Sequence, residues 1–283
     1  MLKKFFDKLT YKPDPIRLYS AGISDVGQRR DHNEDNFLID EKLGLFIVAD
    51  GMGGHEEGEV ASKLAIETLF NHIKKLDDKL QQPSLQEKHK SKSSSEIIHQ
   101  LLQDAIEDAN NQTHCYNLAK GLAEGRGMGT TVTGFLIASM SSALNHSATS
   151  LTKKKLYAFN VGDSRTYCYN QGTLKQLSTD HSHYQLWVET GKDGDPPKHN
   201  IIYKAIGPWR RVVAEQHTVT IKENDIFLLC SDGLSDMLSD QEIRHCLHAQ
   251  RKQSLKKMAQ ALVDAANNAG GKDNISVVLV KPS

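Results

Sequence analysis

The sequence predicts an α/β protein, an α-β-β-α sandwich of two antiparallel sheets with helices packed outside. Three observations lead to this prediction. Short apolar runs rich in β-branched and aromatic residues indicate strands, and amphipathic segments between them indicate helices. Strands and helices do not alternate regularly, which disfavours a doubly wound parallel sheet and favours strand clusters covered by helix pairs.

Four of the apolar runs lie within two residues of an acidic residue. The runs are 45–49 before Asp50, 156–161 before Asp163, 225–230 before Asp232, and 275–280 after Asp273. Each run has the length and the Gly or Asp boundaries typical of a buried strand. The sequence therefore predicts acidic side chains at the ends of at least four core strands.

Four helices are expected between these runs. Segments 59–73 and 95–115 carry apolar residues at three- and four-residue spacing. Ser239 and Glu242 form a capping-box pattern. Ser254 can cap the last helix, which Gly270 and Gly271 would stop. Segment 77–95 is polar and charged and is expected to be a solvated loop or a frayed helix end, and segment 139–155 is expected to be a hairpin loop. Neither segment is expected to have a function of its own.

No linker divides the chain of 283 residues, so we expect an N-terminal extension over residues 1–17 and one domain over 18–283. Lys plus Arg and Asp plus Glu are both 35, so the zero net charge gives no support for nucleic-acid binding. The start of the chain lacks the apolar core of a secretory signal, and no stretch reaches the ~20 apolar residues of a membrane span. We expect a cytoplasmic protein without a membrane partner.

The carboxylates at the strand ends have two interpretations. Each one alone is best explained as a turn residue, because Asp favours turns. Together they would converge at one sheet edge and repel one another unless a cation is present. Oxygen ligands without Cys or regularly spaced His favour Mg²⁺ or Mn²⁺ over zinc. Gly51 and Gly233, which follow two of the acids, are expected to allow a sharp turn and to let a carbonyl approach the ion.

Seven ordered motifs resemble those of one family. They are DVGQRRDHNEDN (25–36), DGMGGH (50–55), GMGTT (127–131), NVGDSR (160–165), TDHS (179–182), SDGL (231–234) and KDNI (272–275). The set resembles the PPM family, the protein phosphatase 2C-like metal-dependent serine/threonine phosphatases, in its bacterial form. The resemblance runs from about residue 18 to 280, nearly the whole chain.

The resemblance implies a centre of two Mn²⁺ or Mg²⁺ ions. Asp50 would bridge the ions, and the Gly51 carbonyl would join it on one of them. Asp232 and Asp273 would complete the other ion, and Glu34 would reach the Gly51 side partly through water. A water activated between the ions would then attack phosphorus, with no protein nucleophile.

Further roles follow from the same resemblance. Asp35 would orient metal-bound water, and Arg30 would receive the phosphate, since a guanidinium fits two phosphate oxygens. Asp163 would hold a weaker third ion with Asp232; the alternative is a turn acid paired with Arg165.

Two positions depart from the family pattern. Met52 stands where many animal and plant relatives carry a histidine considered to protonate the leaving group, so the candidate general acids are a metal-bound water and His55. The alternative for His55 is an exposed histidine at a helix start. The stretch between His183 and Gly207 is shorter than the flap of bacterial relatives, and its segment 191–200 is expected to be an irregular loop.

The resemblance implies hydrolysis of phosphoserine and phosphothreonine in proteins, opposing a cognate Ser/Thr kinase. Two alternatives stay open at this point. One is a hydrolase of small phosphate esters, which would use the same site. The other is a catalytically silent regulatory module, which should have lost the acidic residues that this chain retains.

Overall fold

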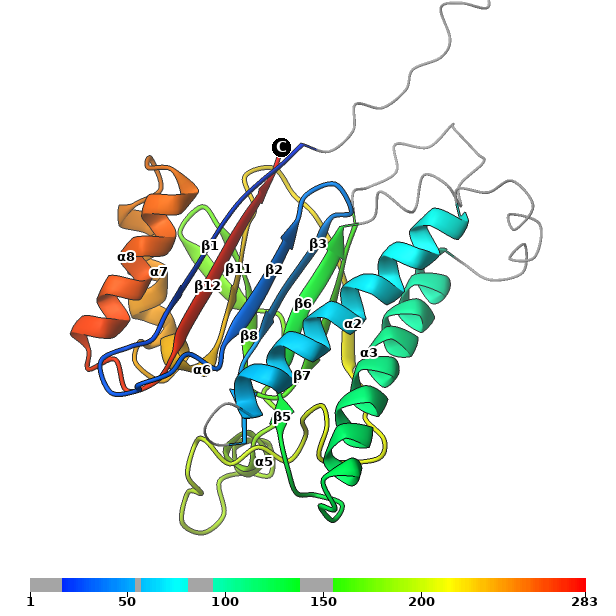
Figure 1. Ribbon diagram of the computed structural model, residues 1–283. Coiled ribbons are helices and arrows are strands. Elements are labelled where there is room, and N and C mark those ends of the chain that lie inside the picture. The colour runs from blue at the N-terminus through cyan, green and yellow to red at the C-terminus, as the bar shows by residue number, and fades with distance from the viewer. Residues whose placement is uncertain (1–16, 54–56, 81–93, 138–154) are drawn as a thin grey trace, which may run out of the picture.

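The computed structural model describes residues 17–53, 57–80, 94–137 and 155–283. Two five-stranded antiparallel sheets pack face to face, with one helix pair on each outer side (Figure 1). The predicted α-β-β-α sandwich is confirmed.

One sheet joins the first and last strands of the fold. Its spatial order is β1 (Leu18–Asp25), β12 (Ile275–Pro282), β11 (Ile226–Cys230), β8 (Arg165–Asn170) and β9 (Thr173–Gln176). All pairs are antiparallel, so the start of β12 lies beside the end of β11. This register brings Asp273 and Asp232 to the same end of the sheet.

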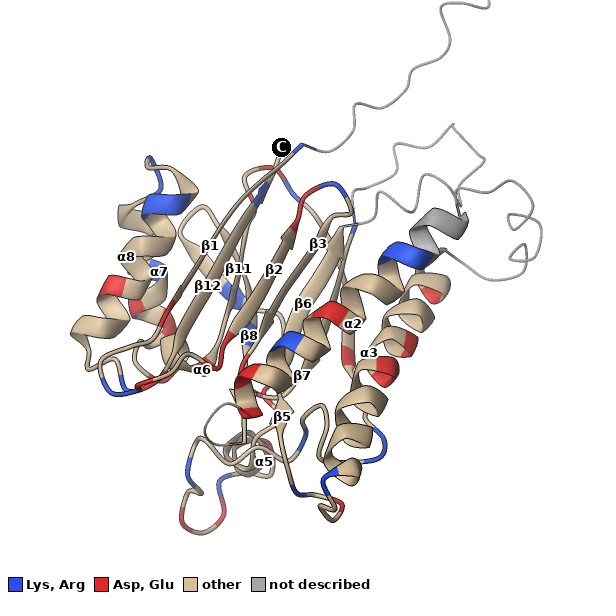
Figure 2. Ribbon diagram, viewed as in Figure 1, with Lys and Arg blue, Asp and Glu red and all other residues tan. Residues whose placement is uncertain are grey.

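The second sheet supplies the other acidic strand ends. Its order is β10 (Glu215–Thr220), β7 (Lys155–Val161), β6 (Val132–Ile137), β3 (Leu45–Ala49) and β2 (Asn36–Asp40). The short strands β4 (Gly51–Met52) and β5 (Gly129–Thr130) pair beyond its end. Figure 2 shows acidic positions gathered where the strands of both sheets end, close to α6.

The helices cover the outer faces. The long helices α2 (Glu57–Leu80) and α3 (Ser94–Ala119) pack on the second sheet, and α7 (Asp240–Ala249) and α8 (Leu255–Asn268) pack on the first. The short helices α5 (His183–Glu189) and α6 (Asp232–Ser235) lie at the end where the acidic residues gather (Figure 1).

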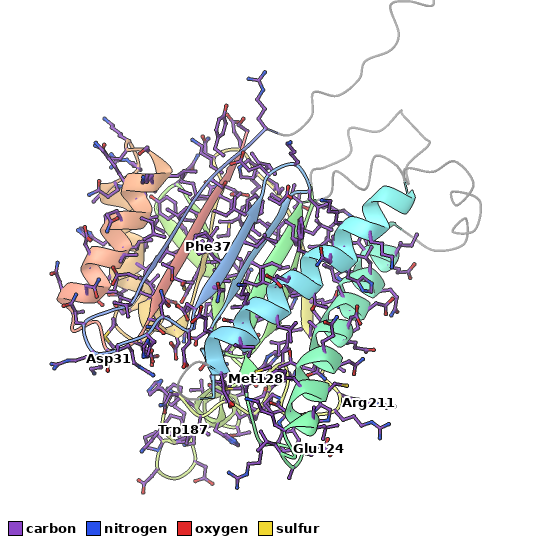
Figure 3. The ribbon with its side chains drawn as sticks, viewed as in Figure 1. Asp31, Phe37, Glu124, Met128, Trp187 and Arg211 are labelled. Atoms are coloured by element: carbon purple, nitrogen blue, oxygen red, sulfur yellow. The ribbon has the colours of Figure 1, made fainter. Side chains whose placement is uncertain are left out.

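The two sheets meet through an apolar layer. Phe135 lies between Phe46 of its own sheet and Phe227 of the other, with ring centroids 5.3 and 5.5 Å apart. All three rings are fully buried, and Phe37 packs against the same layer (Figure 3). This layer fixes the separation of the sheets and hence of the loops at their ends.

The predicted strands and helix starts agree with the structure. Strand 45–49 is found as predicted, Ser239 and Glu242 form the capping box, and Ser254 caps α8. Segment 77–95, expected to be a solvated loop or a helix end, overlaps both long helices, because α2 continues to Leu80 and α3 begins at Ser94. The helix-end alternative therefore applies to residues 77–80 and 94–95. Helix α5, whose N-cap is Ser182, was not anticipated.

Several predictions fall largely outside the described residues. Residues 81–93 and 138–154 cover most of both predicted surface loops, and residues 1–16 cover the predicted extension. Among the helices that the structure describes, none has the length and apolar character needed to cross a membrane.

Candidate metal centre

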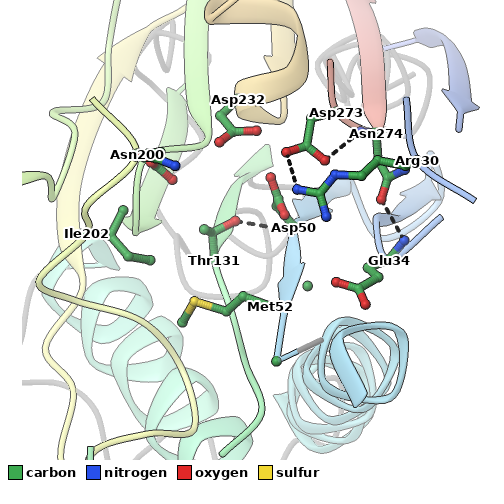
Figure 4. A pocket seen from close by; sticks show the side chains of 13 residues that line it. Arg30, Glu34, Asp50, Met52, Thr131, Asn200, Ile202, Asp232, Asp273 and Asn274 are labelled. Carbon is green, nitrogen blue, oxygen red and sulfur yellow. Dashed lines mark hydrogen bonds and ion pairs between the residues drawn. The ribbon is translucent and has the colours of Figure 1, made fainter. Parts of the chain in front are cut away.

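A cavity of about 270 Å³ opens where the strand ends of both sheets converge. Its lining combines acidic residues, one arginine and both residues of the short strand β4 (Figure 4). The lining residues are Arg30, Glu34, Asp50, Gly51, Met52, Gly53, Thr131, Asp163, Asn200, Ile202, Asp232, Asp273 and Asn274. Seven of the nine predicted site residues lie in this one cavity.

The other two predicted residues do not line the cavity. Asp35 is buried behind it and accepts a hydrogen bond of 2.7 Å from the Ser231 hydroxyl. His55 lies outside the described residues, so its predicted role as general acid stays a prediction. Met52, which stands in place of the family's histidine, does line the cavity.

Glycine is needed at position 51 for close packing. A Cβ atom there would collide with the carbonyl oxygens of Gly58 and Glu34. A Cβ atom on Gly233 would likewise collide with the Asn274 carbonyl. Neither glycine is among the residues with positive φ. Gly51 lies in strand β4 and Gly233 in helix α6, so neither position needs glycine for a left-handed backbone. The two glycines are needed because they let neighbouring backbone approach closely.

The carboxyl groups in and behind the cavity repel one another. Burial, followed by nearby carboxylates, raises the pKa of Asp163 and of Asp35 to about 8 and of Asp232 to about 7. The pKa of Asp50 is raised in the same way, and its carboxyl shares a hydrogen bond with Asp232. Such a cluster favours bound protons or bound cations.

Two observations bear on whether a metal fits. The Oδ1 atoms of Asp35 and Asp232 are buried without a hydrogen-bond partner, so oxygen donors remain available. Across the described ranges, however, no three acidic, His or Cys side chains are arranged to hold one ion by themselves. An ion here would need the Gly51 carbonyl or water as further ligands, which is usual for Mg²⁺. On this basis the donor set fits hydrated divalent cations.

Arg30 faces this acidic cluster from the loop before β2. Its Nη2 atom lies 2.7 Å from Oδ2 of Asp273. Asn274 holds the same loop, because its side chain donates to the carbonyls of Val26 and His32 and accepts from the Glu34 amide at 2.8 Å. The loop thus presents Arg30 and Glu34 to the cavity together (Figure 4).

Asp163 is not paired with Arg165. The Arg165 guanidinium instead grips Asp180, with Nε 2.9 Å from Oδ1 and Nη2 2.6 Å from Oδ2. The alternative interpretation of Asp163 as a turn acid bound to Arg165 is therefore wrong. The Asp163 carboxyl lines the cavity.

Some residues near the cavity were missed by sequence reasoning. Asn200 and Ile202 enter the lining from the loop after α5, and no motif marks them. Asp236, four residues after Asp232, has a pKa raised mainly by burial and adds to the repulsion at Asp163. Residues four apart in a helix lie on the same face, so the spacing of Asp236 from Asp232 could have indicated that both acids lie close together.

The stretch between His183 and Gly207 forms α5 and then an irregular loop. As predicted, 191–200 is not helical, and Gly191 and Gly194 have positive φ. Two contacts anchor the loop near the cavity. The Gly162 amide donates a hydrogen bond to the His181 imidazole at 3.0 Å, and the backbones of Ser182 and Ile202 pair in an isolated antiparallel β-bridge. Trp187 lies beyond the sheets at this end (Figure 3).

Comparison with known proteins gives consistent matches over nearly the whole chain. The sequence model of the family described as Protein phosphatase 2C matches residues 27–277. Serine/threonine phosphatase stp of Listeria welshimeri is 34% identical over 266 residues, covering 91% of this chain and 93% of that protein.

Solved structures agree with the sequence matches. The Mycobacterium tuberculosis serine/threonine phosphatase PstP/Ppp superposes with a TM-score of 0.74 at 28% identity, covering 94% of this chain and 99% of that one. The catalytic domain of the serine/threonine phosphatase PstP in complex with two manganese ions gives 0.74 at 29% identity, covering 95% and 99%.

Proposed function

This chain belongs to the protein phosphatase 2C family, and we propose that it hydrolyses phosphoserine and phosphothreonine in proteins at a centre of two Mn²⁺ or Mg²⁺ ions. The observation that carries the proposal is the convergence of Glu34, Asp50, Asp163, Asp232 and Asp273 on one cavity that also contains Arg30. The two manganese ions in the related catalytic domain support the same metal requirement.

Different carboxylates would bind each of the two ions. We propose that Asp50 contacts both, that the Gly51 carbonyl and Glu34 serve one, and that Asp232 and Asp273 serve the other. When bound, the ions supply the positive charge that makes a water nucleophilic near neutral pH. Asp35, buried behind this set and hydrogen-bonded by Ser231, would keep the surrounding water oriented.

Arg30 would bind the phosphate of the substrate. Its exposed guanidinium stands at the edge of the cavity, where a phosphate on a flexible peptide can reach it. Because a guanidinium donates two parallel hydrogen bonds, it can hold two phosphate oxygens and offset charge as phosphorus is attacked. Asp163 would add a weaker third cation site together with Asp232.

A protein substrate is favoured over a small ester by the setting of the cavity. Ile202 lines the cavity, and exposed apolar side chains of Leu186, Ile201 and Tyr203 lie on the same segment of chain. Such a surface offers contacts to residues on either side of a phosphorylated Ser or Thr. A cognate Ser/Thr kinase is the partner that would supply this substrate.

The test compares two substrates on one enzyme preparation. With Mn²⁺ present, kcat/KM should be higher for a phosphothreonine peptide than for a small aryl phosphate. Equal or lower values for the peptide would favour the small-ester hydrolase. No turnover of either substrate would favour the silent regulatory module.

A further inference from the structure

Thr131 lies between the backbone of Asp50 and the residues that flank Asp163. Thr131 joins β5 to β6, lines the cavity and is almost fully buried. Figure 4 shows its side chain directed toward Asp50. No role was assigned to Thr131 in the proposed reaction, and it carries no charge with which to hold an ion or phosphate.

Thr131 fixes the backbone of Asp50. The Asp50 amide donates to Thr131 Oγ1 at 3.1 Å, and the Thr131 amide donates to the Asp50 carbonyl at 2.8 Å. The Thr130 hydroxyl donates to the same carbonyl at 2.9 Å. The paired register of β3 with β6 ends at Val48, so these bonds hold Asp50 beyond the end of the regular ladder.

The same side chain contacts both neighbours of Asp163. Thr131 Oγ1 lies 2.7 Å from the Ser164 hydroxyl, and both residues are buried. On the other side, a Cβ atom on Gly162 would come within 2.6 Å of the Thr131 methyl group, so this turn packs directly on Thr131. Gly162 also has a φ of 104°, which favours glycine at this position.

A second hydroxyl pair provides a comparison within the same fold. The Thr133 and Thr166 hydroxyls lie 2.8 Å apart and join the two sheets. Each residue lies two positions after Thr131 or Ser164, inside β6 or β8, and both are fully buried. Neither Thr133 nor Thr166 lines the cavity. The two pairs therefore share their chemistry and burial, and differ in that only Thr131 also bonds the Asp50 backbone.

We propose that Thr131 is a positioning residue that sets the separation of the Asp50 and Asp163 carboxylates through its single hydroxyl group. The inference rests on the proposed function, in which both carboxylates hold cations. Asp50 comes from one strand end and Asp163 from another, so a common contact is needed to keep their spacing constant. Residues that orient metal ligands typically change metal affinity or activity by about 10- to 100-fold when altered.

The test uses three variants. Thr131→Val keeps the shape and the packing on Gly162 but removes the hydroxyl, which leaves the Asp50 amide without its acceptor. Thr131→Ser restores the hydroxyl. Thr133→Val breaks the comparison pair and serves as the control. Mn²⁺ binding by calorimetry, kcat and KM for a phosphothreonine peptide, and the thermal unfolding midpoint are measured for each.

We expect Thr131→Val to weaken Mn²⁺ binding by roughly tenfold or more and to lower kcat more than it raises KM. Thr131→Ser should recover most of both losses, and Thr133→Val should change only the unfolding midpoint. Equal Mn²⁺ affinity in all variants would overturn the proposal, as would a serine variant as defective as the valine variant. Should Thr131→Val fail to fold, Ser164→Ala breaks the same 2.7 Å contact, and unchanged turnover there would also overturn it.

Failure of the proposed function is distinguishable from failure of this inference. A wild-type protein that binds Mn²⁺ but does not hydrolyse the peptide would contradict the function. The Mn²⁺ affinities of the valine, serine and control variants would still decide whether Thr131 positions the acidic residues.

Discussion

The Nη2 atom of Arg30 lies 2.7 Å from Oδ2 of Asp273, so the proposed phosphate-binding residue is paired with a proposed metal-binding residue. The Arg30 and Asp273 side chains are 51% and 35% exposed. Ion pairs this exposed typically contribute about 0–1 kcal/mol, so the bond can be exchanged at little cost. A cation at Asp273 and a phosphate at Arg30 would replace it.

Arg30→Lys should therefore weaken substrate binding more than it slows turnover. Lysine keeps the charge but cannot donate two parallel hydrogen bonds. We expect KM for a phosphopeptide to rise roughly tenfold with a smaller fall in kcat, measured by steady-state kinetics. Arg29→Lys, in the same loop but outside the cavity lining, is the control. An unchanged KM with a collapsed kcat would assign Arg30 a different role.

Asp50→Asn should remove most activity while preserving the fold. The amide keeps the shape of the side chain but loses the charge proposed to hold both ions. Turnover should fall by roughly 10³-fold, about 4 kcal/mol of barrier. The unfolding midpoint of the metal-free protein should change little. Asp104→Asn on α3 is the matched control, and near-normal turnover in Asp50→Asn would rule out the bridging role.

Asp163→Ala should separate the third cation site from the other two. Calorimetry is expected to show two ions still bound tightly, whereas most phosphopeptide turnover is lost and added Mn²⁺ does not restore it. A site with few protein ligands is largely water-bound and fills weakly. A variant with a lower unfolding midpoint but a normal rate per molecule would instead make Asp163 a structural residue.

The pKa of Asp163 predicts how the stability of the metal-free protein depends on pH. The pKa is raised by burial to about 8, above the value of about 4 in an unfolded chain. The folded state therefore binds an extra proton between these values. The resulting stabilisation is complete below the unfolded pKa and is lost as pH rises through the folded one.

We accordingly expect the unfolding midpoint in EDTA to fall as pH rises from about 5 to 8 and to level off above that. Asp163→Asn, which resembles the protonated acid, should show a shallower fall over the same range. Thermal unfolding of both proteins across this pH series measures the difference. Parallel curves would show that Asp163 does not carry the effect.

The acidic residues of the site were predictable because each adjoins a strong strand signal. Asp50, Asp163 and Asp232 follow buried runs and Asp273 precedes one, so antiparallel pairing had to bring them to one end. The fold class followed from the same runs together with the helix caps at Ser239 and Ser254. Local pattern and strand register thus determine most of the cavity.

The contacts that support these residues were not predictable. Asn274 holds the Arg30 loop through bonds that span 242 and 248 positions in the sequence. Arg165 pairs with Asp180 and not with Asp163, which is nearer in the sequence. The chain folds back after β9 and brings Asp180 to the guanidinium. Asn200 and Ile202 reach the cavity from an irregular loop, where no periodic pattern predicts the direction of a side chain.

The most direct test of the central claim is hydrolysis of a phosphothreonine peptide by metal-stripped protein before and after addition of Mn²⁺. We expect no measurable turnover in EDTA and full recovery when Mn²⁺ is restored, with Asp50→Asn inactive under both conditions. Full activity in the metal-stripped protein would contradict the proposed two-ion centre.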